Sequence, residues 1–338
     1  MHTFFDTITF LWNGAHLPTA RRLGLVILAG ALVTSTACGS GTTTAATSAS
    51  TASVASDATA SVATTSASSS SEVPSTVTPI TALRPTGMID ELIGAPGERV
   101  HIRCVGQGAT TVLLLSGFGA GAEGWAKVET AIAARSRVCS YERPGTGTSD
   151  PATSTETFTT QATSLHALLG TVGEPGPYVV VGHSFGGAEA VTFASRFADE
   201  VTGLVLVDAS PTTWPASVCA VPDDGSDAAR TLRSLCTDTF APTGNSEHLD
   251  AVTAFAEASH IDSLGALPLA VITATTREVP AGLAPTEVTR LTQEWNQGQQ
   301  AWVALSTDAH LVSVEHTSHH IEIDQPEVVI DEITHLLP

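Results

Sequence analysis

Basic residues are scarce in this sequence. Only 14 of the 338 residues are Lys or Arg, against 34 Asp or Glu, which gives a formal net charge of −20. Nucleic acids and anionic lipids are bound through concentrated positive charge, which a chain of this composition lacks. We therefore expect no nucleic-acid partner and no attachment to a membrane through a basic surface.

Cysteine is also infrequent, and its spacing argues against a common type of metal site. The 5 cysteines include no Cys-x-x-Cys pair. Structural zinc sites usually place two ligands at about that spacing. From these patterns we expect neither a metal nor a cofactor.

The apolar run of residues 23–33 is too short to span a bilayer comfortably. Arg21 and Arg22 precede it and small residues follow it, which is typical of a signal peptide. We interpret residues 1–37 as a signal peptide, and we expect the protein to be exported.

The next residues resemble the cleavage box of bacterial lipoproteins. Ala37 directly precedes Cys38, and Gly-Ser follows; the usual Leu three residues before the Cys is replaced by Ser35. We interpret Cys38 as a lipidation site that would anchor the protein to the cell envelope. The alternative is a secreted protein whose signal peptide is cut elsewhere, with Cys38 a bystander.

Residues 38–80 consist almost entirely of Ser, Thr, Ala and Val. Such a segment cannot bury enough apolar surface to offset the entropy of ordering it. We predict a disordered tether here, followed by a folded domain over residues 81–338.

A strand, a tight turn and a helix follow one another at residues 178–194. Tyr178–Val181 is apolar and mostly β-branched, Gly182–Gly186 reads Gly-His-Ser-Phe-Gly, and residues 188–194 have a helical composition. This order is the context that the Gly-x-Ser-x-Gly nucleophile elbow requires, and the glycines leave room for so sharp a turn. We predict that Ser184 is a catalytic nucleophile; the alternative is a chance match in a chain rich in Gly and Ser.

Strands and helices alternate through the rest of the chain. We expect a hairpin over residues 88–105, strands at 111–115, 138–141, 178–181 and 203–207, and helices at 124–134 and 157–169. Alternation of this kind predicts an α/β fold with a doubly wound, mostly parallel sheet. Reactive groups in such a sheet gather at the carboxyl ends of the strands.

Five segments come in the order seen in the alpha/beta hydrolase superfamily. They are His101–Cys104, Ser116–Gly119, Tyr141–Gly147, Gly182–Gly187 and Leu206–Ser210. The chain resembles this superfamily over roughly residues 85–338, and resembles its exported bacterial members most. The resemblance implies a serine hydrolase with a helical lid insertion, at about residues 211–262.

The resemblance also implies an oxyanion hole made of backbone N–H groups. One donor is the residue after the nucleophile, Phe185, and the other lies in the loop after residues 111–115. We expect Phe118 to be the second donor. Ser116 stands where the family usually has His.

The catalytic base is expected near the C-terminus. Residues 312–326 resemble the family's final strand, a loop of small residues, a His, and Asp-Gln-Pro before the last helix. In that register His319 is the base; His320 is the alternative, and His316 is a weaker one. Imidazole suits this role because it titrates near neutral pH.

The acid departs from the family's commonest pattern. Where most members have an Asp after the seventh strand, this chain has Arg277. Some members place the acid at the end of the sixth strand, where this chain has Asp208. We predict Asp208 as the acid that orients the His, with Glu278 as the alternative.

Four cysteines remain for disulfides in an exported chain. Cys104 and Cys139 lie on strands that can be close in this fold, and Cys219 and Cys236 both lie in the expected lid. We therefore expect the bridges Cys104–Cys139 and Cys219–Cys236.

The sequence thus predicts a serine hydrolase of a small-molecule carboxylic ester, acting through an acyl-enzyme. An amidase or aminopeptidase with the same triad is the alternative, and Asp223, Asp224 and Asp227 of the lid could then bind an amine. A non-catalytic surface protein that retains the fold is a third possibility. Dehalogenase or epoxide hydrolase chemistry is disfavoured because those relatives use a carboxylate nucleophile.

Overall fold

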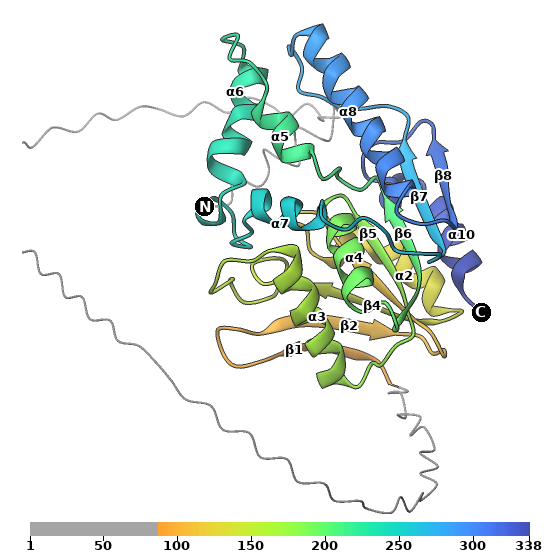
Figure 1. Ribbon diagram of the computed structural model, residues 1–338. Coiled ribbons are helices and arrows are strands. Elements are labelled where there is room, and N and C mark those ends of the chain that lie inside the picture. Colours follow the sequence, from red (N-terminus) through yellow and green to blue (C-terminus); the bar gives the residue numbers. More distant parts are fainter. Residues whose placement is uncertain (1–86) are drawn as a thin grey trace, which may run out of the picture. The chain divides into compact units, whose positions relative to one another are not determined.

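The computed structural model describes residues 87–338, and these form an eight-stranded sheet (Figure 1). Neighbouring strands follow the order β1-β2-β4-β3-β5-β6-β7-β8. Strand β2 is antiparallel to β1 and β4, and the other pairs are parallel. The strands are β1 (Ile89–Ile93), β2 (Val100–Val105), β3 (Thr111–Leu115), β4 (Arg137–Glu142), β5 (Tyr178–His183), β6 (Val201–Val207), β7 (Leu269–Ala274) and β8 (Ala309–Val314). The predicted fold class is confirmed.

The central strands are buried on both faces. Every residue of β3, β4, β5 and β7 is buried, whereas the edge strands β1 and β8 are largely half-buried or exposed. Continuous runs of Val, Leu and Ile are what a parallel sheet covered by helices requires. The apolar runs in the sequence therefore mark the middle of the sheet.

Helices cover both faces of the sheet. Helices α3 (Phe158–Val172) and α4 (Phe185–Arg196) pack on one face, and α2 (Ala126–Ala133) and α10 (Pro326–Leu336) contribute to the separate core on the other (Figure 1). The predicted helix at 124–134 begins as a 3-10 helix, Ala122–Trp125, and continues as α2. Thr157 is the N-cap of α3 and forms a capping box with Thr160.

The insertion between β6 and β7 is helical, as predicted. It contains α5 (Trp214–Cys219), α6 (Asp227–Ser234), a π-helical turn (Leu235–Thr239), a 3-10 turn (Pro242–Gly244) and α7 (Ala251–Ala258). A further long helix, α8 (Pro285–Val303), lies between β7 and β8 in the chain. Helix α9 (Ile321–Asp324) is a single turn before α10. Figure 1 shows the insertion at the same end of the sheet as α8.

Both expected disulfides are present. Cys104 and Cys139 are directly opposite each other on β2 and β4, with their Cα atoms 4.1 Å apart. Cys219 and Cys236 join the end of α5 to the π-helical turn of the insertion. The signal peptide, Cys38 and the tether lie outside the described residues. Within residues 87–338, no helix combines the length and the apolar character needed to cross a membrane.

Candidate active site

Ser184 lies in a strained turn between β5 and α4. Its φ is +54°, in the left-handed region that residues other than glycine rarely adopt. A Cβ at Gly182 would approach the Gly186 carbonyl oxygen to 2.2 Å, and one at Gly186 would approach that of Ser116 to 2.4 Å. The two glycines that flank the serine are therefore required by close backbone contacts, as the elbow motif predicts.

Asp208 and His319 form a buried hydrogen-bonded pair. Asp208 follows β6 directly, with a φ of +42°, and His319 lies in the loop between β8 and α9. His319 Nδ1 is 2.7 Å from Asp208 Oδ2, and the two side chains are 6% and 0% exposed. Because an ionised carboxylate only accepts, Nδ1 carries the proton and the lone pair of the neutral ring is on Nε2.

Asp208 is held by donors other than His319. Its second oxygen, Oδ1, accepts from Arg277 Nη2 at 2.7 Å, Thr273 Oγ1 at 2.9 Å and Trp295 Nε1 at 3.2 Å. Burial by itself raises the pKa of this carboxyl, but Arg277 and His319 together bring the pKa well below its usual range. The carboxylate is therefore ionised wherever the site works.

Arg277 occupies the place at which the superfamily usually has its acid. Its guanidinium binds Asp208 and also lies 4.4 Å above the ring of Trp295. The acid at the end of β6 and the cation after β7 therefore form one unit. In the sequence Arg277 indicates only a missing acid, and Trp295 carries no signal because no pattern in the chain connects α8 with β6.

His319 and Ser184 line the same cavity. Burial lowers the pKa of His319 below its ordinary value of 6.5, and Asp208 opposes that shift without cancelling it. General-base activation needs a neutral, correctly oriented imidazole within reach of the serine hydroxyl, and the shared cavity is consistent with this. Ser184 Oγ also lies 3.3 Å from Ser210 Oγ, a neighbour that the sequence did not indicate.

The alternative bases and acid are placed differently. His320 hydrogen-bonds through Nδ1 to Glu322 at 3.2 Å, and the side chain of His316 is 94% exposed. Glu278 lines the cavity, but the carboxylate bonded to His319 is that of Asp208. These placements favour the pair His319 and Asp208.

The predicted oxyanion loop, Ser116–Gly119, lies against the elbow. An added Cβ on Gly117 would be 3.3 Å from Ser184 Cβ. Phe185 begins α4, so its N–H has no partner inside that helix. The rings of Phe118 and Phe185 are 5.1 Å apart, and both residues line the cavity with Ser184.

Buried charges support this loop. Arg143 donates to the carbonyl oxygens of Ser116 at 2.7 Å and Gly117 at 2.6 Å, and through Nε to Glu247 at 2.6 Å. Glu247 in turn accepts from the Gly119 N–H at 2.5 Å. Glu247 belongs to the insertion, so this lid segment takes part in holding the loop.

Glu189 and Tyr141 complete the same buried group. Arg143 Nη1 lies 3.2 Å from Glu189, which also accepts from the hydroxyl of Tyr141. Burial by itself lowers the pKa of Arg143, whereas Glu247 and Glu189 raise the pKa above its usual range. Burial raises the pKa of Glu189. Arg143 therefore remains charged and compensates part of the negative charge of the two glutamates.

The cavity next to Ser184 has a volume of about 530 Å³. The insertion contributes mainly apolar side chains, among them Trp214, Leu232, Leu235 and Phe240. Carboxylates of Glu123, Glu278, Glu322 and Asp324 come from other parts of the chain. The lid carboxylates Asp223 and Asp224, by contrast, are exposed and accept from nearby backbone N–H groups within their own loop.

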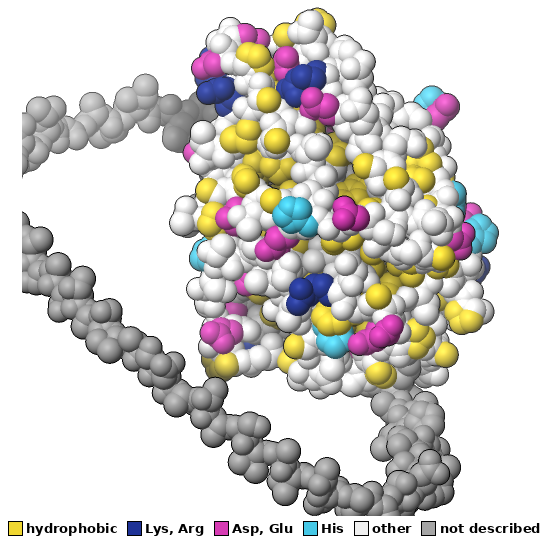
Figure 2. All heavy atoms as spheres, in the orientation of Figure 1, with side chains coloured by type: hydrophobic (Ala, Val, Ile, Leu, Met, Phe, Trp, Pro, Cys, Tyr) yellow, Lys and Arg dark blue, Asp and Glu magenta, His cyan; other side chains and the backbone are white. Residues whose placement is uncertain are grey.

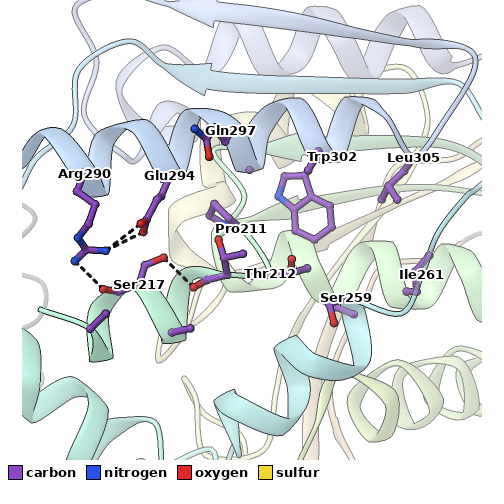
Figure 3. Close-up of a pocket in the computed structure, with 16 residues that line it drawn as sticks. Pro211, Thr212, Ser217, Ser259, Ile261, Arg290, Glu294, Gln297, Trp302 and Leu305 are labelled. Atoms are coloured by element: carbon purple, nitrogen blue, oxygen red, sulfur yellow. Dashed lines mark hydrogen bonds and ion pairs between the residues drawn. The ribbon is translucent and has the colours of Figure 1, made fainter.

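A second cavity of about 560 Å³ lies between α5, α7 and α8 (Figure 3). Arg290 on α8 donates to the Ser217 carbonyl of α5 and pairs with Glu294, as the dashed lines in Figure 3 show. On the face drawn in Figure 2, hydrophobic side chains are visible between the insertion and α8. None of the predicted site residues lines this second cavity.

Comparison with known proteins agrees with this geometry. A family model described as alpha/beta hydrolase fold matches residues 110–240. In structure, carboxylesterase CesB (YbfK) of Bacillus subtilis matches with a TM-score of 0.51 at 15% identity, covering 75% of this chain and 92% of that one. This chain has the alpha/beta hydrolase fold.

Two curated proteins are similar to this chain in sequence. The uncharacterised protein YqjL of Bacillus subtilis is 24% identical over 225 residues, or 66% of this chain and 82% of YqjL. A 2-hydroxy-6-oxononadienedioate/2-hydroxy-6-oxononatrienedioate hydrolase of Paraburkholderia phymatum is 34% identical over 142 residues, or 40% of this chain and 49% of that enzyme. The match thus spans about half the length of this second relative.

Proposed function

We propose that this alpha/beta hydrolase is a serine hydrolase that cleaves a carboxylic ester through an acyl-enzyme. One observation carries the proposal: the buried Asp208–His319 pair, joined at 2.7 Å, shares a cavity with Ser184 on its strained turn. A nucleophile, a base and an orienting acid in this relation form the Ser-His-Asp arrangement.

In the acylation step, Ser184 Oγ attacks the ester carbonyl carbon as His319 Nε2 takes its proton. The negative charge that forms on the carbonyl oxygen is held by the N–H groups of Phe118 and Phe185. The imidazolium returns the proton to the leaving alkoxide, so an alcohol departs and Ser184 is acylated.

Deacylation repeats these steps with water. His319 takes a proton from a water molecule, which attacks the acyl carbon, and the carboxylic acid leaves as Ser184 regains its proton. Asp208 stabilises the imidazolium in both the acylation and the deacylation step. It does not become protonated, because Arg277 keeps the pKa of Asp208 low.

The cavity and the comparisons support an ester substrate. Apolar side chains of the insertion face the nucleophile from the lid side, which suits an acyl or alcohol group. One structural neighbour is named a carboxylesterase, whereas the relative named a 2-hydroxy-6-oxononadienedioate/2-hydroxy-6-oxononatrienedioate hydrolase supports hydrolysis without indicating an ester. The serine nucleophile disfavours the carboxylate-dependent reactions of dehalogenases and epoxide hydrolases.

Hydrolysis of an amide with a free amino group is the second candidate. Glu278 lines the cavity, and its Oε2 is buried without a hydrogen-bond partner among the described residues. A substrate ammonium group would supply that partner. Because Asp223 and Asp224 are exposed within their own loop, Glu278 is the better candidate for this contact.

Nitrophenyl esters of graded chain length, compared with aminoacyl anilides, test the choice between ester and amide. We expect esters to be cleaved faster and Ser184→Ala to abolish both hydrolysis and labelling by a fluorophosphonate probe. Faster cleavage of the anilides would favour the amidase. A wild-type protein that neither labels nor turns over any substrate would be a non-catalytic scaffold.

We also propose that the protein is exported and lipidated on Cys38. The two disulfides in the folded domain fit an oxidising compartment outside the cytoplasm. Mass spectrometry of the mature N-terminus tests this: a diacylated Cys38 is expected, and its loss in Cys38→Ala should release the protein from the envelope. An unmodified N-terminus elsewhere would indicate secretion instead.

A further inference from the structure

We propose that His183, His320 and Glu322 form a binding site for a divalent transition-metal ion, Zn²⁺ in the first place. His183 is the residue before the nucleophile, and the other two lie just after the predicted base. One ligand atom from each of the three residues lies within 4.8 Å of the others. Neither histidine is the proposed base, and Glu322 is not part of the triad.

Two of the distances between the donor atoms are close to those of tetrahedral coordination. Glu322 Oε1 is 3.5 Å from His183 Nδ1 and 3.2 Å from His320 Nδ1. Zinc bonds of about 2.0–2.2 Å to nitrogen and oxygen place neighbouring ligands of a tetrahedron about 3.3–3.6 Å apart. The two distances to Glu322 Oε1 therefore suit an ion held between this carboxylate and the two rings.

The hydrogen bonding of His183 leaves a lone pair directed at this point. His183 Nε2 lies 3.0 Å from the carbonyl oxygen of His319, which can only accept, so Nε2 carries the proton. In a neutral ring Nδ1 then has a lone pair, and it faces the carboxylate of Glu322. Two acceptors in contact repel unless a cation or a proton lies between them. A metal-bound histidine usually donates its other N–H to a carbonyl or carboxylate oxygen, as His183 does here.

Glu322 provides a further reason to expect a cation. The side chain is only 4% exposed, and its Oε2 has no hydrogen-bond partner among the described residues. A buried carboxylate oxygen without a partner is costly, and a cation bound to the same carboxylate would offset that cost. Glu278 and Asp324 line the same cavity and favour the entry of positive charge.

The ion would be reached through the active-site cavity, because all three ligands line it. The rings of His183 and His319 are 4.6 Å apart. A double positive charge bound to His183 would therefore lie beside His319 and oppose formation of the imidazolium that His319 must become. We therefore infer that the ion inhibits hydrolysis; this consequence rests on the proposed function, whereas the binding site itself does not.

Equilibrium dialysis of the chelator-treated full chain against Zn²⁺ tests the site directly. We expect one ion per chain, with affinity at least about tenfold lower in Glu322→Gln and in His320→Gln. His316→Gln is the matched control, because that exposed histidine lies in the same loop and should not affect binding. Co²⁺ should give the intense visible absorption of a tetrahedral site in wild type, and weaker absorption in the two ligand variants.

The Ser184→Ala variant separates the two proposals. If it binds Zn²⁺ as wild type does, the site stands even where no hydrolysis can be measured. In an active enzyme, Zn²⁺ should inhibit ester cleavage in wild type and in His316→Gln, and at least about tenfold higher concentrations should be needed in Glu322→Gln. Absence of stoichiometric binding, or equal binding in wild type and Glu322→Gln, would overturn the metal proposal. A proton shared between His320 and Glu322 would then account for the cluster.

Discussion

At the scale of single residues, the most informative feature is the exchange of acid and cation around His319. The family's usual acid position is taken by Arg277, and Asp208 at the end of β6 is bonded to His319. Arg277 and Asp208 are 6% and 0% exposed, so the two buried charges compensate each other in the interior. A carboxylate after β7 would remove this cation, and the two acids would then repel each other.

Replacing the acid tests this assignment. Asp208→Asn should lower kcat for ester hydrolysis by roughly 10³–10⁴-fold, because the amide cannot hold the imidazole in the required tautomer or stabilise its charged form. Glu278→Gln should leave ester hydrolysis close to wild type. Steady-state kinetics of both variants on one nitrophenyl ester decide the matter, and the opposite ranking would make Glu278 the acid.

The pH dependence of kcat/KM reports the base. His319 must be neutral to accept a proton, so activity is present above its pKa and is lost as the pH falls through that value. Since burial lowers the pKa of His319 below 6.5, the acid limb should have its midpoint below pH 6.5. A midpoint above 6.5 would instead point to a group with a raised pKa, such as His320 beside Glu322.

At the scale of elements, the insertion does more than cover the cavity. Glu247 from this segment binds both Arg143 and the Gly119 N–H, and Arg143 binds the carbonyls of Ser116 and Gly117. The lid segment and the oxyanion loop are thus held by one buried charge group. Movement of the segment that carries Glu247 would be transmitted to the donors that stabilise the transition state.

Glu247→Gln should therefore lower kcat by about tenfold or more while changing KM little, because a misplaced oxyanion donor affects the transition state and not ground-state binding. Glu257→Gln serves as the control: Glu257 lies in α7 of the same insertion and contacts Thr159, away from the loop. An increase in KM alone would mean that Glu247 shapes the substrate cavity and does not position the oxyanion loop.

At the scale of the whole molecule, the two disulfides act on different units. Cys104–Cys139 joins β2 to β4 within the sheet, across 35 residues, and both side chains belong to the main core. Cys219–Cys236 closes 17 residues within the insertion. The first bridge constrains the unfolded state of the domain, and the second mainly limits the insertion.

The double variant Cys104→Ala/Cys139→Ala should lose about 3–4 kcal/mol of unfolding free energy on the chain-entropy model. Urea unfolding in oxidising buffer measures the loss. The matched pair Cys219→Ala/Cys236→Ala should instead alter proteolysis of the insertion and KM more than global unfolding. If the second pair destabilised the whole domain as much as the first, the insertion would have to be an integral part of the cooperative core.

Much of this protein can be inferred from its sequence because the signals are local. Buried parallel strands require continuous apolar runs, and the elbow requires glycines within the five-residue turn centred on Ser184. The fold class, the strand positions and the turn therefore follow from short windows of sequence. The two disulfide pairs followed once that fold was assumed. The signal peptide, the tether and the lipidation of Cys38 stay predictions.

Contacts between distant segments required the tertiary structure. Arg277 lies after β7, Trp295 in α8 and Glu247 in the insertion, and no spacing in the chain connects them with Asp208 or Gly119. In the proposed metal site, His183 lies 137 positions from His320 and 139 positions from Glu322 along the chain. Such a site has no sequence motif. Sequence determined which local shapes could form, and tertiary packing decided which charges meet in the interior, because burial acts on groups that are neighbours only in space.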